Sequence, residues 1–284
     1  MTTLMYHDIA PAGAEDSSGF PGRDAARYKV TPELFAAHLK AIACQLFFAG
    51  VGAPPPTRAN ADASPRFSSA AAQRSRGRSP VLTFDDGGVS AMGAADALEH
   101  HGFRGHFFIT VNYVGAPGFV DERDIRDLCR RGHTVGSHSS SHPLRMGHCS
   151  WPRLLDEWTR SRATLEKIIG EEIRTASVPG GDFAPRVAEA AARAGFTKLF
   201  TSEPTRKLRR VLGLTLLGRY TIQRWTTADT VAGLVTGAWV PCARQAIIWN
   251  AKKLSKCLSG EQYLKLRRLL LRHGDEVRWG DESG

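Results

Sequence analysis

Two adjacent carboxylates are the first residues whose types and spacing could do chemistry. Asp85 and Asp86 directly follow the apolar run 81–84 and are followed by two glycines. This pattern is typical of a buried strand that ends in a tight turn. Burying two like charges side by side is costly, because they repel each other and lose hydration. A bound metal or a catalytic proton would offset that cost. The alternative is that one carboxylate caps a following helix and the other is solvated.

Two histidines form the second group of candidate residues. His138 and His142 are separated by three serines and are followed by Pro143. We expect this pair on a loop at the end of a strand, at the same edge of the sheet as Asp85 and Asp86. Two imidazoles and one carboxylate, with coordination positions left open, are typical of a hydrolytic metal site. These ligands suit Zn²⁺ and also other divalent first-row metals.

The elements that must position these residues alternate between strands and helices. Short apolar runs predict the strands, and amphipathic runs closed by glycine predict the helices between them. The predicted strands cover 4–7, 81–84, 105–110, 133–138, 173–178, 196–201 and 210–220, and the predicted helices cover 31–42, 89–101, 121–131, 151–169 and 182–194. This alternation predicts parallel strands wrapped by helices. In such folds the site lies at the carboxyl ends of the strands.

The domain organisation follows from where this pattern breaks. We assign residues 1–43 to the first strand and helix of a barrel domain and 80–225 to the rest of that barrel. Residues 44–79 are rich in Pro, Ala, Ser and Arg and predict a long loop. Residues 226–284 form a helical extension in which basic and apolar residues alternate. This extension is either a helical layer with a solvated basic face or an interfacial surface that touches anionic lipid.

Composition narrows the class of protein. The net charge of +10 and the pI of about 9.7 suit nucleic acid, an anionic membrane or an acidic polymer. We expect no nucleic-acid partner, because no zinc-finger spacing or RNA-binding motif occurs. The five cysteines are odd in number and form no Cys-x-x-Cys pair, which argues against a disulfide framework and a thiolate zinc site. Without a signal-peptide pattern or an apolar run of ~18 residues, we expect a cytoplasmic protein, either free or peripheral at a membrane.

The two motifs together resemble the signature of the polysaccharide deacetylase family, also called the NodB homology domain or carbohydrate esterase family 4. Thr-Phe-Asp-Asp-Gly at 83–87 and His-Ser-x-x-His-Pro at 138–143 carry the resemblance, and Leu-Met-Tyr-His at 4–7 is similar to the start of many members. The likeness spans about residues 1–225 and is weak between 44 and 79.

The resemblance implies a fold, a reaction and a set of site residues. The fold is an α/β, distorted (β/α)7-type barrel, and the reaction removes acetyl groups from N-acetylated sugars of a polysaccharide or glycan intermediate, as in exopolysaccharide biosynthesis. By this resemblance, Asp86, His138 and His142 bind a divalent metal, with Zn²⁺ expected first and Co²⁺ or Ni²⁺ as alternatives. The general base is Asp85.

The chain departs from the family in its third motif. That motif usually carries an arginine that steadies the base, and Ser177 stands in its place two residues before Pro179. Arg174 lies three residues before Ser177. Strand alternation therefore places it on the opposite face of the sheet.

The last family motif, which usually supplies a histidine acid, is also altered. The corresponding stretch 214–224 contains Arg219 and Arg224 but no histidine. His7, at the end of the first predicted strand, is a candidate for the missing acid, and Arg219 is a second catalytic candidate. His7 could equally hydrogen-bond Asp8 or the outer shell of the metal site.

These observations favour a metal-dependent hydrolase that acts on an N-acetylated glycan or a lipid-linked sugar. A cytoplasmic enzyme would meet a nucleotide sugar, a lipid-linked intermediate or a glycan under assembly. The alternative is a catalytically impaired barrel that holds metal and binds glycan without turnover, because the usual arginine and histidine are missing. The sequence leaves the oligomeric state open.

Overall fold

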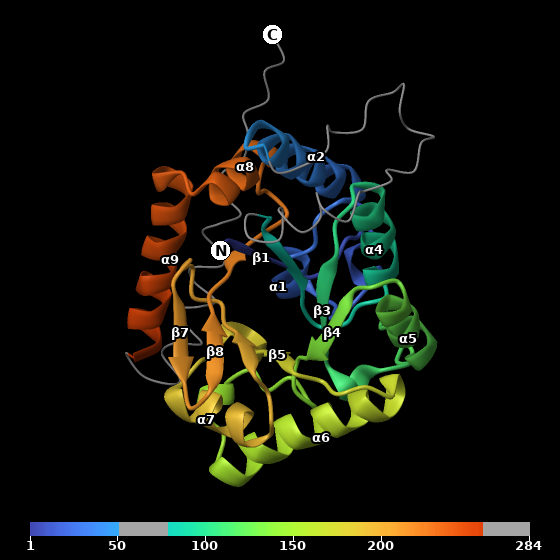
Figure 1. Cartoon of the computed structure of the whole chain (residues 1–284), viewed down its shortest axis with the longest axis vertical. Coiled ribbons are helices and arrows are strands. Elements are labelled where there is room, and N and C mark those ends of the chain that lie inside the picture. The colour runs from blue at the N-terminus through green and yellow to red at the C-terminus, as the bar shows by residue number, and fades with distance from the viewer. Residues whose placement is uncertain (51–78, 258–284) are drawn as a thin grey trace.

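The chain folds around one sheet that curls on itself (Figure 1). The computed structural model describes residues 1–50 and 79–257. Most of the predicted loop 44–79 and part of the helical extension therefore lie outside the described residues. The strands are β1 (Thr3–Tyr6), β2 (Val81–Phe84), β3 (Gly105–Ile109), β4 (Thr134–Ser137), β5 (Thr175–Ser177), β6 (Lys198–Phe200), β7 (Leu208–Val211), β8 (Leu214–Leu217) and β9 (Tyr220–Thr221). The α-helices are α1 (Arg23–Ala26), α2 (Pro32–Phe48), α4 (Ala91–His100), α5 (Glu122–Arg130), α6 (Trp151–Ile169), α7 (Pro185–Arg193), α8 (Ala228–Thr236) and α9 (Trp239–Cys257). Short 3₁₀ helices are η1 (Glu15–Ser17), η2 (Val111–Tyr113), η3 (Met146–His148) and η4 (Pro179–Gly181).

The order of the strands explains the curled shape. In the described residues the nine strands follow the order β7-β8-β6-β5-β4-β3-β2-β1-β9, and every pair is parallel except β7 with β8. β8 and β9 lie near opposite ends of this order, yet only Gly218 and Arg219 separate them in sequence. The sheet must therefore bend until its two ends nearly meet. This confirms the predicted distorted barrel.

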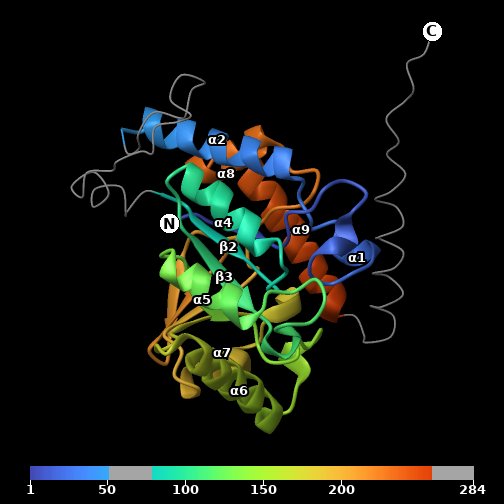
Figure 2. The same cartoon turned by 90° about the vertical axis from the view of Figure 1, so that its right-hand side faces the viewer.

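The helices cover the outside of the curled sheet. Figure 1 shows α4 and α5 on one side, α6 and α7 below and α9 on the opposite side. Figure 2 shows α2 and α8 side by side across the top, where they pack against each other. Local signals start and stop these helices as predicted. The Thr31 side chain caps α2, with Pro32 at its first position, and Gly170 ends α6 in the left-handed region at φ 80°.

One predicted strand is wrong. The stretch 210–220 was expected to form a single strand, but it contributes parts of β7, β8 and β9. Leu212 at φ 51° and Gly213 at φ 79° form a two-residue turn between β7 and β8. Turns with two positive φ angles match the twist of paired strands, so they close tight hairpins.

Strand alternation divides the apolar core into two parts. The larger part fills the space between the sheet and the outer helices and includes Phe107 and Leu199. The smaller part lies inside the curled sheet and consists of Phe108, Phe200 and Leu217. Neighbouring residues of β3 and β6 thus belong to different parts, because successive side chains of a strand point to opposite faces.

The helical extension presents an apolar surface. No single helix in the ranges 1–50 and 79–257 is long and apolar enough to cross a membrane, whereas α8 and α9 together reach that length and composition but are bent by 95°. The exposed apolar side chains of α9 include Trp239, Val240, Ile247 and Ile248. Contact between this extension and a membrane stays a prediction.

Candidate metal and catalytic site

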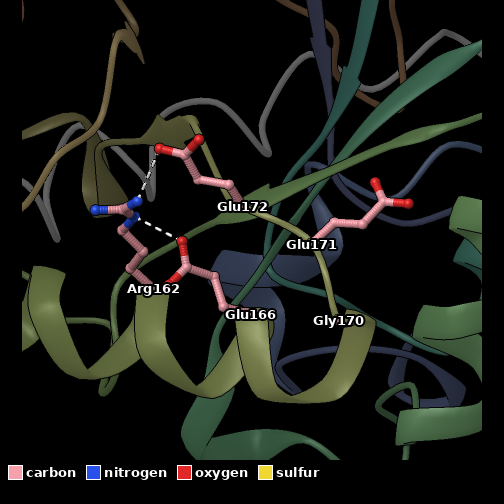
Figure 3. A pocket seen from close by; sticks show the side chains of 5 residues that line it. All are labelled: Arg162, Glu166, Gly170, Glu171 and Glu172. Atoms are coloured by element: carbon pink, nitrogen blue, oxygen red, sulfur yellow. Dashed lines mark hydrogen bonds and ion pairs between the residues drawn. The ribbon is translucent and has the colours of Figure 1, made fainter.

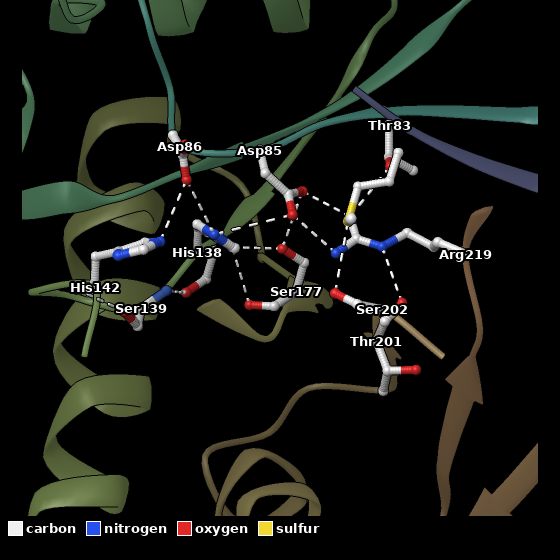
Figure 4. Close-up of polar contacts among 12 residues, drawn as sticks. Thr83, Asp85, Asp86, His138, Ser139, His142, Ser177, Thr201, Ser202 and Arg219 are labelled. Atoms are coloured by element: carbon white, nitrogen blue, oxygen red, sulfur yellow. Dashed lines mark hydrogen bonds and ion pairs between the residues drawn. The ribbon is translucent and has the colours of Figure 1, made fainter. Parts of the chain in front are cut away.

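Asp86, His138 and His142 converge at the carboxyl ends of β2 and β4 (Figure 4). Asp86 Oδ1 lies 3.3 Å from His138 Nε2 and 3.4 Å from His142 Nε2. The ligand atoms that the three residues offer all lie within 4.8 Å of one another. Asp86 Oδ1 is buried and has no hydrogen-bonding partner among the described residues. An unpartnered buried oxygen facing two imidazole nitrogens fits a divalent cation.

Local backbone geometry turns all three ligands toward one point. Asp86 follows β2 with φ 78°, so the chain leaves the extended conformation immediately after Asp85. Ser139 at φ 66° and His142 at φ 56° bend the loop after β4 in the same way. Left-handed conformations cost energy for residues other than glycine and cluster at functional sites. These bends allow adjacent or closely spaced residues to share one site.

Asp85 faces a different partner. Arg219, between β8 and β9, donates to Asp85 through Nη1 at 2.6 Å and Nη2 at 2.8 Å. Both side chains are almost completely buried. Arg219 also donates to Thr83 Oγ1 at 3.1 Å and to the Thr201 carbonyl at 3.2 Å. A two-point ion pair with further hydrogen bonds holds the carboxylate in one orientation.

Ser177 joins the two halves of the site. Its hydroxyl donates to Asp85 Oδ1 at 3.2 Å and contacts His138 Nδ1 at 2.5 Å. The Ser177 carbonyl lies 3.2 Å from the same nitrogen. These contacts occupy His138 Nδ1 and leave its Nε2 directed toward Asp86. Partners of this kind fix the orientation and tautomer of a metal-ligating histidine. Ser177 therefore has a role of its own at the position where the family arginine was expected.

The surroundings lower the pKa values of Asp85 and Asp86 and raise the pKa of His142. Burial would raise the pKa of Asp85, but the charge and hydrogen bonds of Arg219, together with the nearby His138 and His7, outweigh burial and hold this pKa below its usual range. Burial also opposes ionisation of Asp86, and the adjacent imidazoles hold its pKa well below the usual range. The pKa of His142 is raised, because Asp86 outweighs the effect of burial. Both carboxylates are thus kept ionised in the folded chain.

His7 lies beside this pair. β1 and β2 are paired in parallel with Tyr6 opposite Phe84, so His7 and Asp85 leave the sheet side by side. His7 is close enough for its charge to lower the pKa of both Asp85 and Asp86. Its Nδ1 is buried without a hydrogen-bonding partner in the described residues. The ring packs against Tyr28, with 4.8 Å between ring centroids.

Asp8 does not bind His7 but anchors the loop that follows β1. Its Oδ1 accepts hydrogen bonds from Ser18 Oγ at 2.6 Å and Ser90 Oγ at 2.9 Å. The buried Lys29 ammonium donates to the carbonyls of three residues of the same loop, which are Glu15, Ser18 and Phe20. These contacts satisfy all three N–H groups of the lysine. The loop is thereby fixed over the carboxyl edge of the sheet.

The fixed loop brings an aromatic ring to His142, one of the three candidate metal ligands. The Phe20 ring lies 4.8 Å from the ring of His142 and 4.8 Å from that of Tyr113, measured between centroids. Phe119 completes the group, at 5.2 Å from Phe20 and 4.9 Å from Tyr113. Phe20, Tyr113 and Phe119 are all partly exposed. We call these three residues the aromatic rim.

A hollow lies at the opposite edge of the sheet, where the strands begin (Figure 3). It is lined by Arg162, Glu166 and the segment 170–172, which precedes β5. Arg162 pairs with Glu166 at 2.9 Å and with Glu172 at 3.0 Å. Because Arg162 pairs with two of the three glutamates at the amino end of β5, this hollow is an ion-pair cluster away from Asp85 and Asp86.

The structure thus brings together all of the residues proposed from the sequence. Asp85, Asp86, His138, His142 and Arg219 share contacts, and His7 lies beside them. Arg174 lies on the outside, paired with Glu172. Sequence reasoning missed the contacts of Ser177, Lys29 and the aromatic rim, as well as Glu157 on α6. Only Glu157 carries a signal in the sequence, because it is a charged residue within the apolar stripe of its helix.

Comparison with known proteins agrees with this geometry. Residues 72–199 match the family model for polysaccharide deacetylase. Among solved structures, the chain resembles BC0361, a polysaccharide deacetylase from Bacillus cereus, with a TM-score of 0.61 at 20% identity over 82% of this chain and 68% of that one. IcaB from Ammonifex degensii gives a TM-score of 0.58 at 19% identity over 82% and 96% of the two chains. The Streptococcus pyogenes deacetylase PplD, solved in complex with acetate, gives 0.58 at 17% identity over 81% and 95%.

These matches show the fold and a family likeness of one segment. At such low identity the solved structures show a shared fold, and the likeness to the family rests on the match over residues 72–199. No curated protein sequence matches the chain significantly. The segment 72–199 matches the polysaccharide deacetylase family model, and Asp85, Asp86, His138 and His142 all lie within it.

Proposed function

We propose that this deacetylase is a metal-dependent hydrolase that removes acetyl groups from N-acetylated sugars of a glycan. The convergence of Asp86 with His138 and His142, beside a separately held Asp85, is the observation that carries the proposal. Asp86, His138 and His142 would hold the metal, with Zn²⁺ expected first. A divalent metal bound there supplies polarisation of the acetamide carbonyl, which is otherwise a poor electrophile.

Asp85 is proposed as the general base. Its carboxylate is ionised, because Arg219 holds its pKa below the usual range, and its Oδ2 lies 3.9 Å from His138 Nε2 at the edge of the ligand group. A carboxylate in that position can take the proton from the water that attacks the acetyl carbon. Arg219 and Ser177 occupy both of its oxygens and so orient it.

His7 is proposed as the acid. When the C–N bond of the acetamide breaks, the leaving amine must gain a proton. His7 lies next to Asp85 on the neighbouring strand, and its buried Nδ1 has no hydrogen-bonding partner in the described part of the chain. An imidazole can carry a proton near neutral pH. The missing histidine of the last family motif would thus be replaced by a histidine from the first strand.

The surroundings of the ligands support a sugar as the substrate. The aromatic rim stands next to His142 and is partly exposed. Ligand sites combine such apolar surfaces with a few placed polar groups. A pyranose ring has apolar C–H faces that suit an aromatic wall and hydroxyls that suit the polar edge. The solved relative PplD holds acetate, which would be the product of the proposed reaction.

The test uses the full chain and two histidine variants. Purified protein loaded with Zn²⁺ or Co²⁺ is expected to release acetate from N-acetylglucosamine oligomers. His138→Ala is expected to lose both bound metal and activity, because one of its three ligands is gone. His148→Ala is the matched control, since His148 is 60% exposed and lies outside the ligand group.

Metal bound by His138→Ala at the level of the parent would contradict the site. No acetate from the loaded parent on a broad panel of glycans would favour glycan binding without turnover.

A further inference from the structure

We propose that Glu157 of α6 is a positioning residue that sets the spacing between His138 and His142. This inference rests on the proposed metal site. Glu157 contacts neither a ligand side chain nor Asp85, and it acts through the backbone of the three serines between the histidines. Glu157 is only 5% exposed and lies against that loop.

The contacts between Glu157 and the loop are direct. Glu157 Oε2 accepts the backbone N–H of Ser140 at 2.9 Å and that of Ser141 at 2.8 Å. Its Oε1 accepts the Ser141 hydroxyl, and its own carbonyl accepts the Ser140 hydroxyl at 3.2 Å. One side chain therefore satisfies three donors from two adjacent residues. Charge-assisted hydrogen bonds of this kind are stronger than neutral ones.

The loop needs such support because its backbone is strained. Ser139 and His142 both have positive φ angles, of 66° and 56°. Non-glycine residues persist in this region only where the surroundings over-determine them. Ser139 Oγ also accepts the His142 N–H at 3.1 Å, so the loop forms a closed turn. With both ends of the turn strained, the two N–H groups at its centre are the points at which α6 can hold it.

A second contact of α6 supports the same reading. Ser161 lies one helical turn after Glu157, and its hydroxyl lies 2.6 Å from that of Ser137 at the end of β4. On the other side of the loop, the N–H groups of Val111 and Asn112 donate to the carbonyls of Ser139 and Ser140. The loop is thus held by hydrogen bonds from both α6 and η2. Among the described residues that make these hydrogen bonds, Glu157 is the only charged one.

The position of Glu157 in the sequence agrees with a specific role. The buried residues of α6 include Leu154, Trp158, Leu165 and Ile168, which form an apolar stripe. Glu157 falls within this stripe, where a charge is costly unless it is paired. Arg153 approaches it only at 3.8 Å from a side chain that is 57% exposed. The cost of burying the carboxylate is therefore offset mainly by the histidine loop.

The experiment compares metal affinity in Glu157 variants. Glu157→Ala leaves the N–H groups of Ser140 and Ser141 without their acceptor, and the affinity for Zn²⁺ is expected to fall about 10–100-fold. Competition with a chelating dye measures it. Glu157→Gln keeps one oxygen for the two N–H groups, and its amide can donate to the Ser141 hydroxyl, so its affinity is expected to recover most of the loss. The absorption spectrum at saturating Co²⁺ reports the ligand geometry and is expected to change in Glu157→Ala.

A control on the same helix separates positioning from general stability. Glu166→Ala removes a carboxylate that accepts the Ile173 N–H at 3.1 Å and pairs with Arg162, away from the metal ligands. Both alanine variants are expected to lower the melting temperature. Only Glu157→Ala is expected to change Zn²⁺ affinity and the Co²⁺ spectrum.

The outcomes distinguish this inference from the proposed function. If the parent chain binds no metal, the proposed site itself fails. If the parent binds metal and Glu157→Ala binds it equally well with the same Co²⁺ spectrum, the positioning role alone is overturned. Should Glu157→Ala not fold, Glu157→Asp withdraws the carboxylate by one methylene and is expected to weaken Zn²⁺ binding. Unchanged affinity in that variant would overturn the role as well.

Discussion

The inside of the curled sheet contains two layers that treat ionisable groups differently. The upper layer, at the carboxyl ends of the strands, holds Asp85 and Arg219 as a fully buried ion pair. The layer below it holds Phe108 and Phe200, over which the Arg219 guanidinium stacks at 5.7 and 5.9 Å. His106 packs against both rings, and its buried Nδ1 has no hydrogen-bonding partner in the part of the chain that the structure describes.

The difference between the layers is one of partners rather than of depth. Burial lowers the pKa of His106 to about 4, so this histidine is neutral at physiological pH. Burial acts on Asp85 too, yet the fixed charge of Arg219 keeps that carboxylate ionised. A buried group therefore stays charged only where an opposite charge is held beside it. Such a partner stands beside Asp85, and none is found beside His106 in the described part of the chain.

The largest expected effect is on activity, and it comes from removing the negative charge of Asp85 while keeping the shape of its side chain. Asp85→Asn keeps the side-chain volume but cannot accept the proton of the attacking water. Acetate release is expected to fall about 10²–10⁴-fold, the usual contribution of a general base. Metal content, measured by elemental analysis, is expected to persist because Asp86, His138 and His142 are intact. Activity near that of the parent would show that Asp85 is not the base.

Breaking the pair from the other side is expected to destabilise the fold. Arg219→Met leaves Asp85 buried without its counter-charge, which is expected to cost about 3–5 kcal/mol of unfolding free energy. Since only His138 and His7 then oppose the effect of burial, the pKa of Asp85 rises, and the loss of stability shrinks as the pH falls and the carboxyl protonates. Urea unfolding at several pH values measures this.

Two further variants test whether the cost comes from the unpaired charge. Adding Asp85→Asn to Arg219→Met is expected to recover part of the lost stability, because no buried charge then lacks a partner. Arg209→Met removes an exposed arginine that pairs with Glu203 and is expected to change stability by no more than about 1 kcal/mol. A double variant less stable than Arg219→Met would contradict this account of the upper layer.

The smallest expected effect concerns the lower layer. The pKa of His106 is about 4 in the folded chain, against about 6.5 for an exposed histidine. Between these values the unfolded state binds a proton that the folded state excludes, so stability falls as the pH drops from about 6.5 to 4. This loss amounts to no more than about 3 kcal/mol. His106→Phe is expected to flatten that part of the stability curve, measured by urea unfolding. Equal slopes in the two proteins would mean that His106 is not the group responsible.

The sequence alone predicted much of the sheet, and it predicted that Asp86 would meet His138 and His142. Apolar periodicity placed β1 to β6 and α2, α4, α5, α6 and α7 between them, but not the short α1, since period and capping are local properties. Parallel strands end at one edge, so the residues after the second and fourth strands were expected to meet there. Asp86 does meet His138 and His142. The two-residue turn at Leu212 and Gly213 was missed because it interrupts a run that reads as one apolar strand.

The side chains that contact Asp85 could not be predicted in the same way. Arg219 and Asp85 are 134 residues apart, and nothing near either residue indicates the other. Ser177 looked like a defect in a family motif, but in the folded chain it contacts both Asp85 and His138. Such contacts depend on how far the sheet bends, which no local pattern expresses.

The sequence by itself determined the ligand types, the edge of the sheet where they gather and the family to which the motifs belong. It did so because residue types, strand periods and helix caps act over a few residues. Only the tertiary structure decided that Arg219 supplies the charge beside Asp85, that His7 stands next to Asp85 and that Glu157 holds the histidine loop. Each of these depends on closure of the sheet or on packing of a helix against a loop, and those arise from the core as a whole.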